Sequence, residues 1–216
     1  MNREGVAHLA IAAERLGIPV FHISTNYVFA GDAREPYRET DPVGLTGIYG
    51  ASKLGGEVML AAHCSSHIIL RTSWVFGAHG NNFVKTMLRL GRERDELGVV
   101  ADQRGGPTSA ASIARTLWTL AVQYRDRGAL QWGLYHYSGA PASTWHEFAL
   151  EIFRQAHELG LLERVPVVRA IASADYPTPA TRPAWSVLDC RKLHEVHDIA
   201  QADWREELGL VLQELT

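Results

Sequence analysis

Residues 23–53 read ISTNYVFAGDAREPYRETDPVGLTGIYGASK. The stretch begins with two hydroxyl residues, Ser24 and Thr25, at the end of an apolar run, and it ends with Tyr49-Gly-Ala-Ser-Lys53. Residues four apart in a helix lie on one face, about 6 Å apart along the axis, so the Tyr49 phenol and the Lys53 ammonium can reach one bound molecule. This spacing indicates redox chemistry at a carbonyl, because a nearby ammonium favours the phenolate form of a tyrosine. Surface helices also show the same spacing without any catalytic role.

The segments around this stretch alternate between helical and strand patterns. Residues 2–17 have apolar side chains at helical spacing, whereas residues 18–23 (IPVFHI) form an almost uninterrupted apolar run, typical of a strand in a parallel sheet. The alternation continues along the chain and predicts an α/β fold with parallel strands. We expect further helices over 47–62, 82–96, 112–125, 144–159 and 204–215, and strands over 67–71, 133–137 and 165–171. A short strand begins at Val99-Val100, and a loop and strand cover 181–193.

Composition excludes several classes of protein. The chain has 216 residues, of which 46% are hydrophobic, enough for one large domain with a substantial core. A formal net charge of -3 argues against a dedicated nucleic-acid binder. The sequence has neither an apolar run long enough to span a membrane nor the pattern of a secretory signal, so we expect a cytoplasmic protein without a membrane partner.

Cysteine and histidine spacing predicts neither a disulfide framework nor a metal site. Cys64 and Cys190 are far apart and belong to no CxxC motif, so we expect both to be reduced. His63 and His67 flank Cys64, but they fall at a helix end and a strand start, where helical spacing no longer aligns them. We therefore expect no bound metal.

Several motifs occur together in one order: STNYVFAG, EPYRETDP, YGASKLGGE, LRTSWVFG and DQRGGPTSA. In this combination the sequence resembles the dTDP-4-dehydrorhamnose reductases, members of the extended short-chain dehydrogenase/reductase family, from Asn2 through RPAWSVLD at 182–189. The resemblance implies a partial Rossmann-like, doubly wound parallel sheet with a small C-terminal substrate-binding lobe. It divides the chain into residues 1–105, the C-terminal part of an NAD(P)-binding domain with the Tyr/Lys pair, and residues 106–216, a mixed α/β lobe interleaved with the first.

The resemblance also assigns catalytic roles. Thr25 would hydrogen-bond the keto oxygen of the sugar, and Tyr49 would donate the proton as hydride arrives. Lys53 would hold the nicotinamide ribose and tune Tyr49, with Thr72 also near the cofactor.

Substrate contacts follow from the same resemblance. Thr25, Asn26 and Trp74 would contact the deoxythymidine-diphosphate sugar, and Arg182 would pair with its diphosphate. An aromatic face suits the C–H surface of a sugar, although a core tryptophan explains Trp74 equally well from the sequence. The family usually reads STDYVFDG, so Asn26 and Ala30 replace two aspartates, and Asn26 keeps hydrogen bonding without the charge.

The glycine-rich turn of the family has no counterpart. Family members start with a strand and a GxxGxxG turn that receives the pyrophosphate, whereas the nearest spacing here, Gly50 to Gly56, lies within the Tyr/Lys helix itself. We therefore expect a fragment or a displaced start that lacks most of the cofactor site and binds NADPH or NADH weakly or not at all. Loss of a neighbouring strand would expose the apolar edge of residues 18–23 and favour poor solubility or self-association, including a homodimer.

The function that we expect is reduction of dTDP-4-dehydro-L-rhamnose to dTDP-L-rhamnose by hydride from NADPH or NADH, for cell-surface polysaccharide. Two alternatives stay open. One is a related sugar-nucleotide epimerase or dehydratase with the same Tyr/Lys pair. The other is a non-catalytic subunit, like the reductase-like regulatory subunits of methionine adenosyltransferase.

Overall fold

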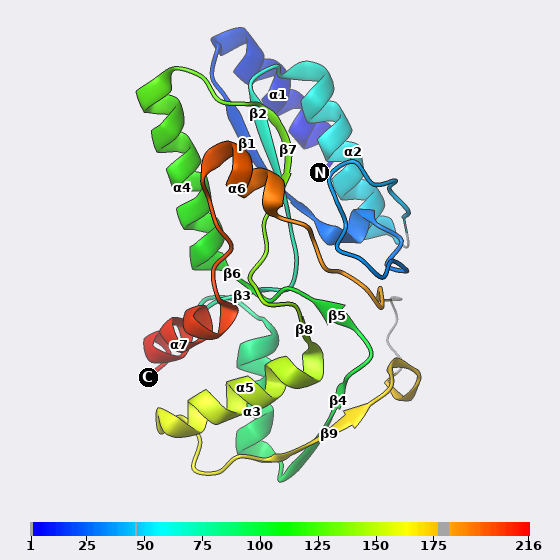
Figure 1. Cartoon of the computed structure of the whole chain (residues 1–216), viewed down its shortest axis with the longest axis vertical. Helices are drawn as coiled ribbons and strands as arrows, with labels where there is room; N and C mark the ends of the chain where they lie inside the picture. The colour runs from blue at the N-terminus through cyan, green and yellow to red at the C-terminus, as the bar shows by residue number, and fades with distance from the viewer. Residues whose placement is uncertain (1, 46, 177–181) are drawn as a thin grey trace.

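The computed structural model describes residues 2–45, 47–176 and 182–216 (Figure 1), in which helices and strands alternate along the chain. Thr181, the first residue of the expected tail loop, lies outside these ranges. The elements are α1 (Glu4–Leu16), β1 (Val20–Thr25), η1 (Asn26–Val28), α2 (Ile48–His63), β2 (His67–Thr72), β3 (Val75–Phe76), α3 (Phe83–Glu93), β4 (Glu96–Val100), β5 (Arg104–Gly105), β6 (Thr108–Ser109), α4 (Ala110–Arg127), β7 (Gly133–His136), β8 (Ser143–Thr144), α5 (Trp145–Glu158), β9 (Val167–Ile171), η2 (Ser173–Asp175), α6 (Arg191–His197) and α7 (Trp204–Glu214).

The main sheet is parallel, in the order β1-β2-β7, and helices cover both of its faces. Side chains alternate along β2, so Ile69 packs with Ala10 of α1 and Leu60 of α2 on one face. On the other face, β2 packs against α4 and α6, and this second core consists of Ile68, Leu70, Ile113, Leu120, Tyr135, Tyr137 and Leu193. The doubly wound α/β class expected from the sequence is thereby confirmed.

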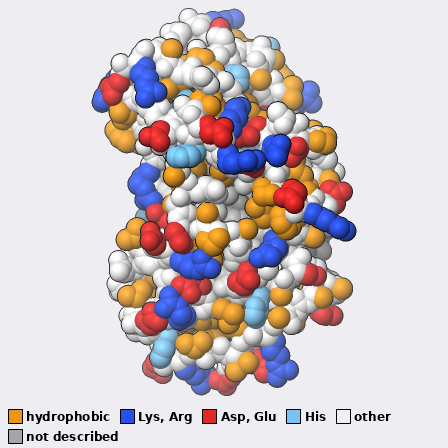
Figure 2. Space-filling model, viewed as in Figure 1, with side chains coloured by type: hydrophobic (Ala, Val, Ile, Leu, Met, Phe, Trp, Pro, Cys, Tyr) orange, Lys and Arg blue, Asp and Glu red, His pale blue; other side chains and the backbone are white. Residues whose placement is uncertain are grey.

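A second layered half lies below the sheet in Figure 1 and contains α3, α5, α7 and the parallel pair β4-β9. Its core is large and aromatic, with Phe76, Phe148, Phe153 and Trp204 fully buried. The short pairs β3-β6 and β5-β8 involve the segments that connect the two halves. On the face in Figure 2, acidic and basic side chains are interspersed over both halves.

Elements from both sides of residue 105 occur in each half of the molecule. β7 completes the sheet that β1 and β2 begin, and α4 and α6 pack on one face of it, while α3 and β4 pack with α5, α7 and β9. The division of the chain at residue 105 into two interleaved parts stays a prediction about domains.

Local sequence explains most of the element ends. Gly17 ends α1 with φ +66°, a left-handed conformation that glycine adopts without a steric penalty. Asn82 caps α3 by accepting from Lys85 N, and Thr144 forms a capping box with Glu147 at the start of α5. α3 ends at Glu93, three residues earlier than expected, because Glu96 pairs with Val167 at the start of β4.

Candidate active site

The carboxyl ends of β1 and β2 place two threonines side by side. Thr25 and Thr72 are partners in the parallel ladder, and both are buried, at 5% and 4% exposure. Ligands of open α/β sheets bind at this edge, where the strands end. Thr72 Oγ1 has no hydrogen-bond partner within the described part of the chain and lines a cavity, so this hydroxyl is available to a bound molecule.

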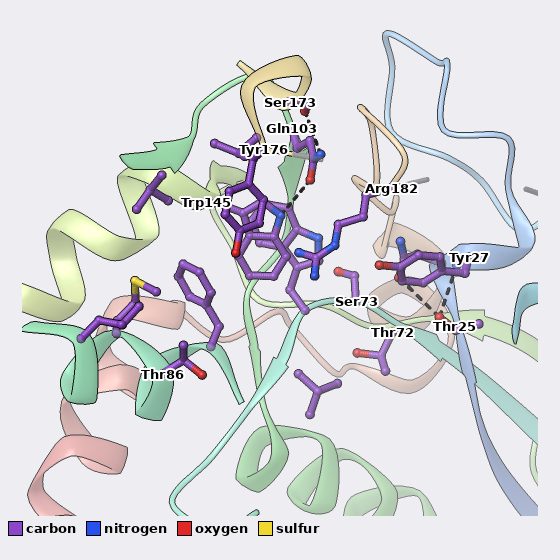
Figure 3. Close-up of a pocket in the computed structure, with 18 of the residues that line it drawn as sticks. Thr25, Tyr27, Thr72, Ser73, Thr86, Gln103, Trp145, Ser173, Tyr176 and Arg182 are labelled. Atoms are coloured by element: carbon purple, nitrogen blue, oxygen red, sulfur yellow. Dashed lines mark hydrogen bonds between the residues drawn. The ribbon is translucent and has the colours of Figure 1, made fainter. Parts of the chain in front are cut away.

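The chain turns sharply after Thr25 and brings Asn26 to the same edge. Thr25 Oγ1 accepts from the backbone N–H of Tyr27 at 3.3 Å and donates to Asn26 Oδ1 at 3.5 Å (Figure 3). Asn26 is 3% exposed, and its Nδ2 has no partner among residues 2–45, 47–176 and 182–216. A buried amide donor without a partner is costly, and a bound acceptor would satisfy it.

Helix α2 presents Tyr49 at its first turn. The Tyr49 ring lies edge-on to that of Tyr27, with centroids 5.8 Å apart, and the side chain is 55% exposed at the rim of the cavity. Gly50 permits this approach, because a Cβ at this position would lie 2.1 Å from the carbonyl oxygen of Tyr27. The sequence Tyr-Gly therefore packs the first turn of α2 directly against η1.

Lys53 lies one helical turn beyond Tyr49, at the border of the cavity and not in its lining. Its Nζ donates to the carbonyl oxygen of Ile23 at 2.5 Å, which ties α2 to the last residues of β1. Burial lowers the pKa of Lys53, and the carboxylate of Glu57 opposes this shift. His22 lies nearby and is neutral at neutral pH, because burial, and then Lys53, lowers its pKa to about 4.

The cavity has a volume of about 1020 Å³ and extends from the strand ends to α3 and β4. It brings together six of the seven residues expected at the site: Thr25, Asn26, Tyr49, Thr72, Trp74 and Arg182. Arg182 is exposed and lies between Trp145 and Tyr27 in Figure 3. The roles assigned to these residues stay predictions.

A stacked pair of tryptophans forms one wall of the cavity. The rings of Trp74 and Trp145 are nearly parallel, with centroids 3.6 Å apart and an interplanar angle of 10°. Gly105 packs against Trp74, where a Cβ would lie 2.4 Å from the indole. Trp74 is partly exposed and lines the cavity, so it is not a core tryptophan.

Two residues of this wall were not expected from the sequence. Trp145 Nε1 donates to Gln103 Oε1 at 3.2 Å, and Gln103 Nε2 donates to Ser173 Oγ at 2.8 Å (Figure 3). Gln103 belongs to the DQRGGPTSA motif, which was a usable signal, whereas Trp145 looked like part of the apolar side of a helix.

Neither cysteine approaches this site. Cys64 and Cys190 are buried and free, and burial raises the pKa of the Cys190 thiol to about 12. Within the described ranges, no three His, Cys, Asp or Glu side chains are grouped so that they could hold a metal ion. In the same ranges, no helix has the length and apolar character needed to cross a membrane.

A Tyr/Lys helix at the carboxyl edge of a parallel, doubly wound sheet defines the class of Rossmann-like dehydrogenases and reductases. Solved structures agree: a dTDP-4-dehydrorhamnose reductase from Clostridium acetobutylicum is 38% identical with a TM-score of 0.88, covering 100% of this chain and 72% of that one. The reductase from Bacillus anthracis, in complex with NADP, is 35% identical with a TM-score of 0.89, covering 99% and 72%.

Sequence comparison identifies the family. The dTDP-4-dehydrorhamnose reductase of Aggregatibacter actinomycetemcomitans is 47% identical over 208 residues, which are 96% of this chain and 71% of that protein. The chain belongs to the RmlD substrate binding domain family, whose sequence model matches residues 1–216. The resemblance to the dTDP-4-dehydrorhamnose reductases is confirmed.

Proposed function

We propose that this chain reduces dTDP-4-dehydro-L-rhamnose to dTDP-L-rhamnose, a sugar nucleotide of polysaccharide biosynthesis. The observation that carries the proposal is the convergence of Thr25, Tyr49 and Trp74 on one cavity at the carboxyl edge of the sheet, with Lys53 one turn from Tyr49. A relative that is 47% identical and carries this enzyme name supports it. The epimerase and dehydratase alternatives have no such support here.

The described residues fit a nicotinamide cofactor at the strand ends. The buried hydroxyl of Thr72 has no hydrogen-bond partner among the residues that the structure describes, and Thr72 lines the cavity. The Lys53 ammonium lies beside Ile23, another residue of the cavity lining. We infer that Lys53 and Thr72 hold the nicotinamide half of NADPH or NADH. The hydride for the sugar carbon is supplied by that cofactor when it is bound.

Protein groups then handle the oxygen and its proton. Thr25 Oγ1 would donate to the keto oxygen in place of its long bond to Asn26, and the Tyr49 phenol would transfer its proton to the same oxygen. Donors aimed at an oxygen that gains negative charge stabilise the transition state more than the ground state. Lys53, as an ammonium one turn away, would stabilise the tyrosinate left behind.

The remaining cavity residues would bind the rest of the substrate. The exposed face of the stacked tryptophans suits a sugar or base ring, and Arg182 supplies a cation for the diphosphate. Asn26 Nδ2 offers one further donor to the sugar.

Turnover by the 216-residue chain tests the proposal. Oxidation of NADPH would be followed with dTDP-4-dehydrorhamnose, and Tyr49→Phe should lower kcat roughly 10²- to 10⁴-fold, the usual contribution of a general acid. Calorimetric titration with NADPH and with the sugar nucleotide runs in parallel. If both NADPH and the sugar nucleotide bind but no turnover follows in the wild type, that result would contradict the enzyme and support a non-catalytic binding subunit.

We also infer a cytoplasmic site of action and self-association as a homodimer. Four apolar side chains that are at least 40% exposed support the homodimer: Leu9 and Leu16 on α1, Ile18 just before β1, and Ile23 on β1. Sedimentation equilibrium that shows a monomer at every concentration would contradict it.

A further inference from the structure

Three polar side chains form a buried network beneath the site. Ser24 Oγ donates to Glu57 Oε1. Arg71 donates two hydrogen bonds to the same carboxylate, from Nε to Oε1 at 3.0 Å and from Nη2 to Oε2 at 2.6 Å. Ser24, Glu57 and Arg71 are 3%, 5% and 3% exposed. None of them lines the cavity except Ser24, so none except Ser24 can touch a substrate bound there.

Each member of the network sits next to a residue of the proposed site. Ser24 precedes Thr25 on β1, Arg71 precedes Thr72 on β2, and Glu57 lies one helical turn after Lys53 on α2. Ser24 and Arg71 are themselves partners in the ladder, directly below the pair Thr25 and Thr72. The network therefore joins β1, β2 and α2 one layer beneath the groups that would perform the reaction.

Stability alone is a poor explanation for such a network. Burying an ion pair costs desolvation energy that its attraction often does not offset, and apolar replacements of similar volume are frequently neutral or stabilising. Arg71 also leaves Nη1 without a partner in the described ranges, with only the Phe29 ring stacked nearby, 5.0 Å from the guanidinium carbon. The directional bonds, rather than the burial, distinguish this trio from an apolar core.

We propose that the Ser24–Glu57–Arg71 network is a positioning device for the reaction proposed above. It fixes α2 against the ends of β1 and β2, so that Lys53 is held in one position relative to Thr25 and Thr72. The proposal rests on the proposed function for its kinetic consequence only. Glu57 and Arg71 are positioning residues that act through Lys53 and Thr72, and they exchange no proton with substrate.

Electrostatics provides a direct way to observe this link. The charged groups that face Glu57 are Arg71 from β2 and Lys53 from α2, with the neutral His22 from β1. Burial lowers the pKa of Lys53, and the Glu57 carboxylate raises it again. Removing that charge while keeping the shape, as in Glu57→Gln, should therefore lower the pKa of Lys53 further.

The chain contains only three lysines, Lys53, Lys85 and Lys192, so their ε-carbons can be titrated individually by ¹³C NMR. Conservative Lys→Arg substitutions at positions 85 and 192 assign the signals. In Glu57→Gln the midpoint of Lys53 should fall by roughly 0.5 to 1.5 pH units, as expected for loss of a neighbouring charge in a partly buried setting. Lys192, which also donates to a backbone carbonyl, is the internal control and should not move.

A second Ser–Glu–Arg trio elsewhere in the fold provides a matched control. Glu207 is 7% exposed, accepts from Ser109 Oγ at 2.5 Å and pairs with Arg115, away from the cavity lining. Glu57→Gln should lower kcat roughly 10- to 100-fold with the sugar-nucleotide KM within about threefold, because misplaced groups lose rate rather than binding. Glu207→Gln should leave kcat and the Lys53 midpoint unchanged, whatever its effect on unfolding.

A paired apolar replacement, Glu57→Leu with Arg71→Met, guards against a simple folding defect. If the network served stability alone, this variant should keep both the wild-type unfolding temperature and the wild-type kcat. We expect the unfolding temperature to be kept and kcat to fall. An unchanged Lys53 midpoint in Glu57→Gln, or full kcat in the apolar pair, would overturn the proposal. Absence of turnover in the wild type, with NADPH and the sugar nucleotide both bound, would contradict the proposed function instead, and the Lys53 titration would still decide whether Glu57 acts on Lys53.

Discussion

Trp74 adopts a backbone conformation that bulky residues rarely occupy, with φ +47°. Such a conformation costs on the order of 1–3 kcal/mol and persists only where surrounding contacts impose it. Here Gly105 on one side and Trp145 on the other enclose the indole. The shape of the cavity wall thus depends on Trp145, a residue that sequence motifs did not single out.

Trp145→Ala should weaken binding of the sugar nucleotide rather than the chemical step. Loss of an aromatic stacking partner costs about 0.5–1.5 kcal/mol, which corresponds to a rise in KM of about 2- to 12-fold, with kcat within about twofold. Trp118→Ala is the control, because Trp118 is 72% exposed on α4. Steady-state kinetics that show a fall in kcat at unchanged KM would contradict a binding role for this wall.

Local spacing pointed to some candidate site residues, whose roles rest on the family resemblance, and could not point to others. Tyr49 and Lys53 are recognisable because a helix keeps residues four apart on one face, and Thr25 because it ends an apolar run. Trp145 approaches Trp74 across 71 positions of sequence through tertiary packing, and no local pattern encodes that contact. The Glu57–Arg71 pair was missed for the same reason, since each residue alone resembles an ordinary surface charge.

Helix α2 packs closely against η1 at its first turn, where Gly50 meets the backbone of Tyr27. Gly50→Ala would place a Cβ against the backbone oxygen of Tyr27, which cannot rotate away as a side chain could. We expect a loss of about 1–3 kcal/mol in the free energy of unfolding, as for other overpacked sites, together with lower activity because Tyr49 moves. Urea unfolding and turnover measure the two effects.

Gly5→Ala is the matched control, since a Cβ there meets nothing within 4 Å in the helix α1. This substitution should stabilise by about 0.5–1 kcal/mol through higher helix propensity. If both substitutions behaved alike, close packing of α2 on η1 would not be what Gly50 provides.

Element boundaries show where the sequence patterns were insufficient. The helix α6 was not expected, because its seven residues are mostly charged or histidine and show no apolar period. β4 begins at Glu96 rather than at Val99, since its pairing with β9 includes Glu96, Leu97 and Gly98. Strand pairing with a distant segment, rather than local propensity, decided that length.

At the scale of the whole molecule, the buried His136 makes stability depend on pH. Burial, and then the Arg71 charge, lowers its pKa to about 3, against about 6.5 for an unfolded histidine. Between these values the unfolded state binds a proton that the folded state does not, so stability rises with pH through this window and is lost as pH falls. His136 should contribute a loss of up to about 2 kcal/mol between pH 7 and pH 5.

His136→Phe should reduce that pH dependence while keeping an aromatic ring against Phe29. Urea unfolding at both pH values measures the difference, and His8→Asn, at an exposed position of α1, should retain the wild-type dependence. Equal losses in the wild type and His136→Phe would show that other groups dominate the acid response.

The order of the sheet has a consequence for how the chain is made. β7 pairs with β2, yet α3, β4 and α4 separate them in sequence, so an emerging chain holds β2 with β1 but without β7 until about sixty more residues have been synthesised. Closing so long a loop is slow compared with local pairing, and Ile68 and Leu70, on the face of β2 that α4 and α6 later cover, stay exposed meanwhile. The nascent chain is therefore most exposed to chaperones and to misassociation when α1, β1, α2 and β2 have left the ribosome but α4, β7 and α6 have not.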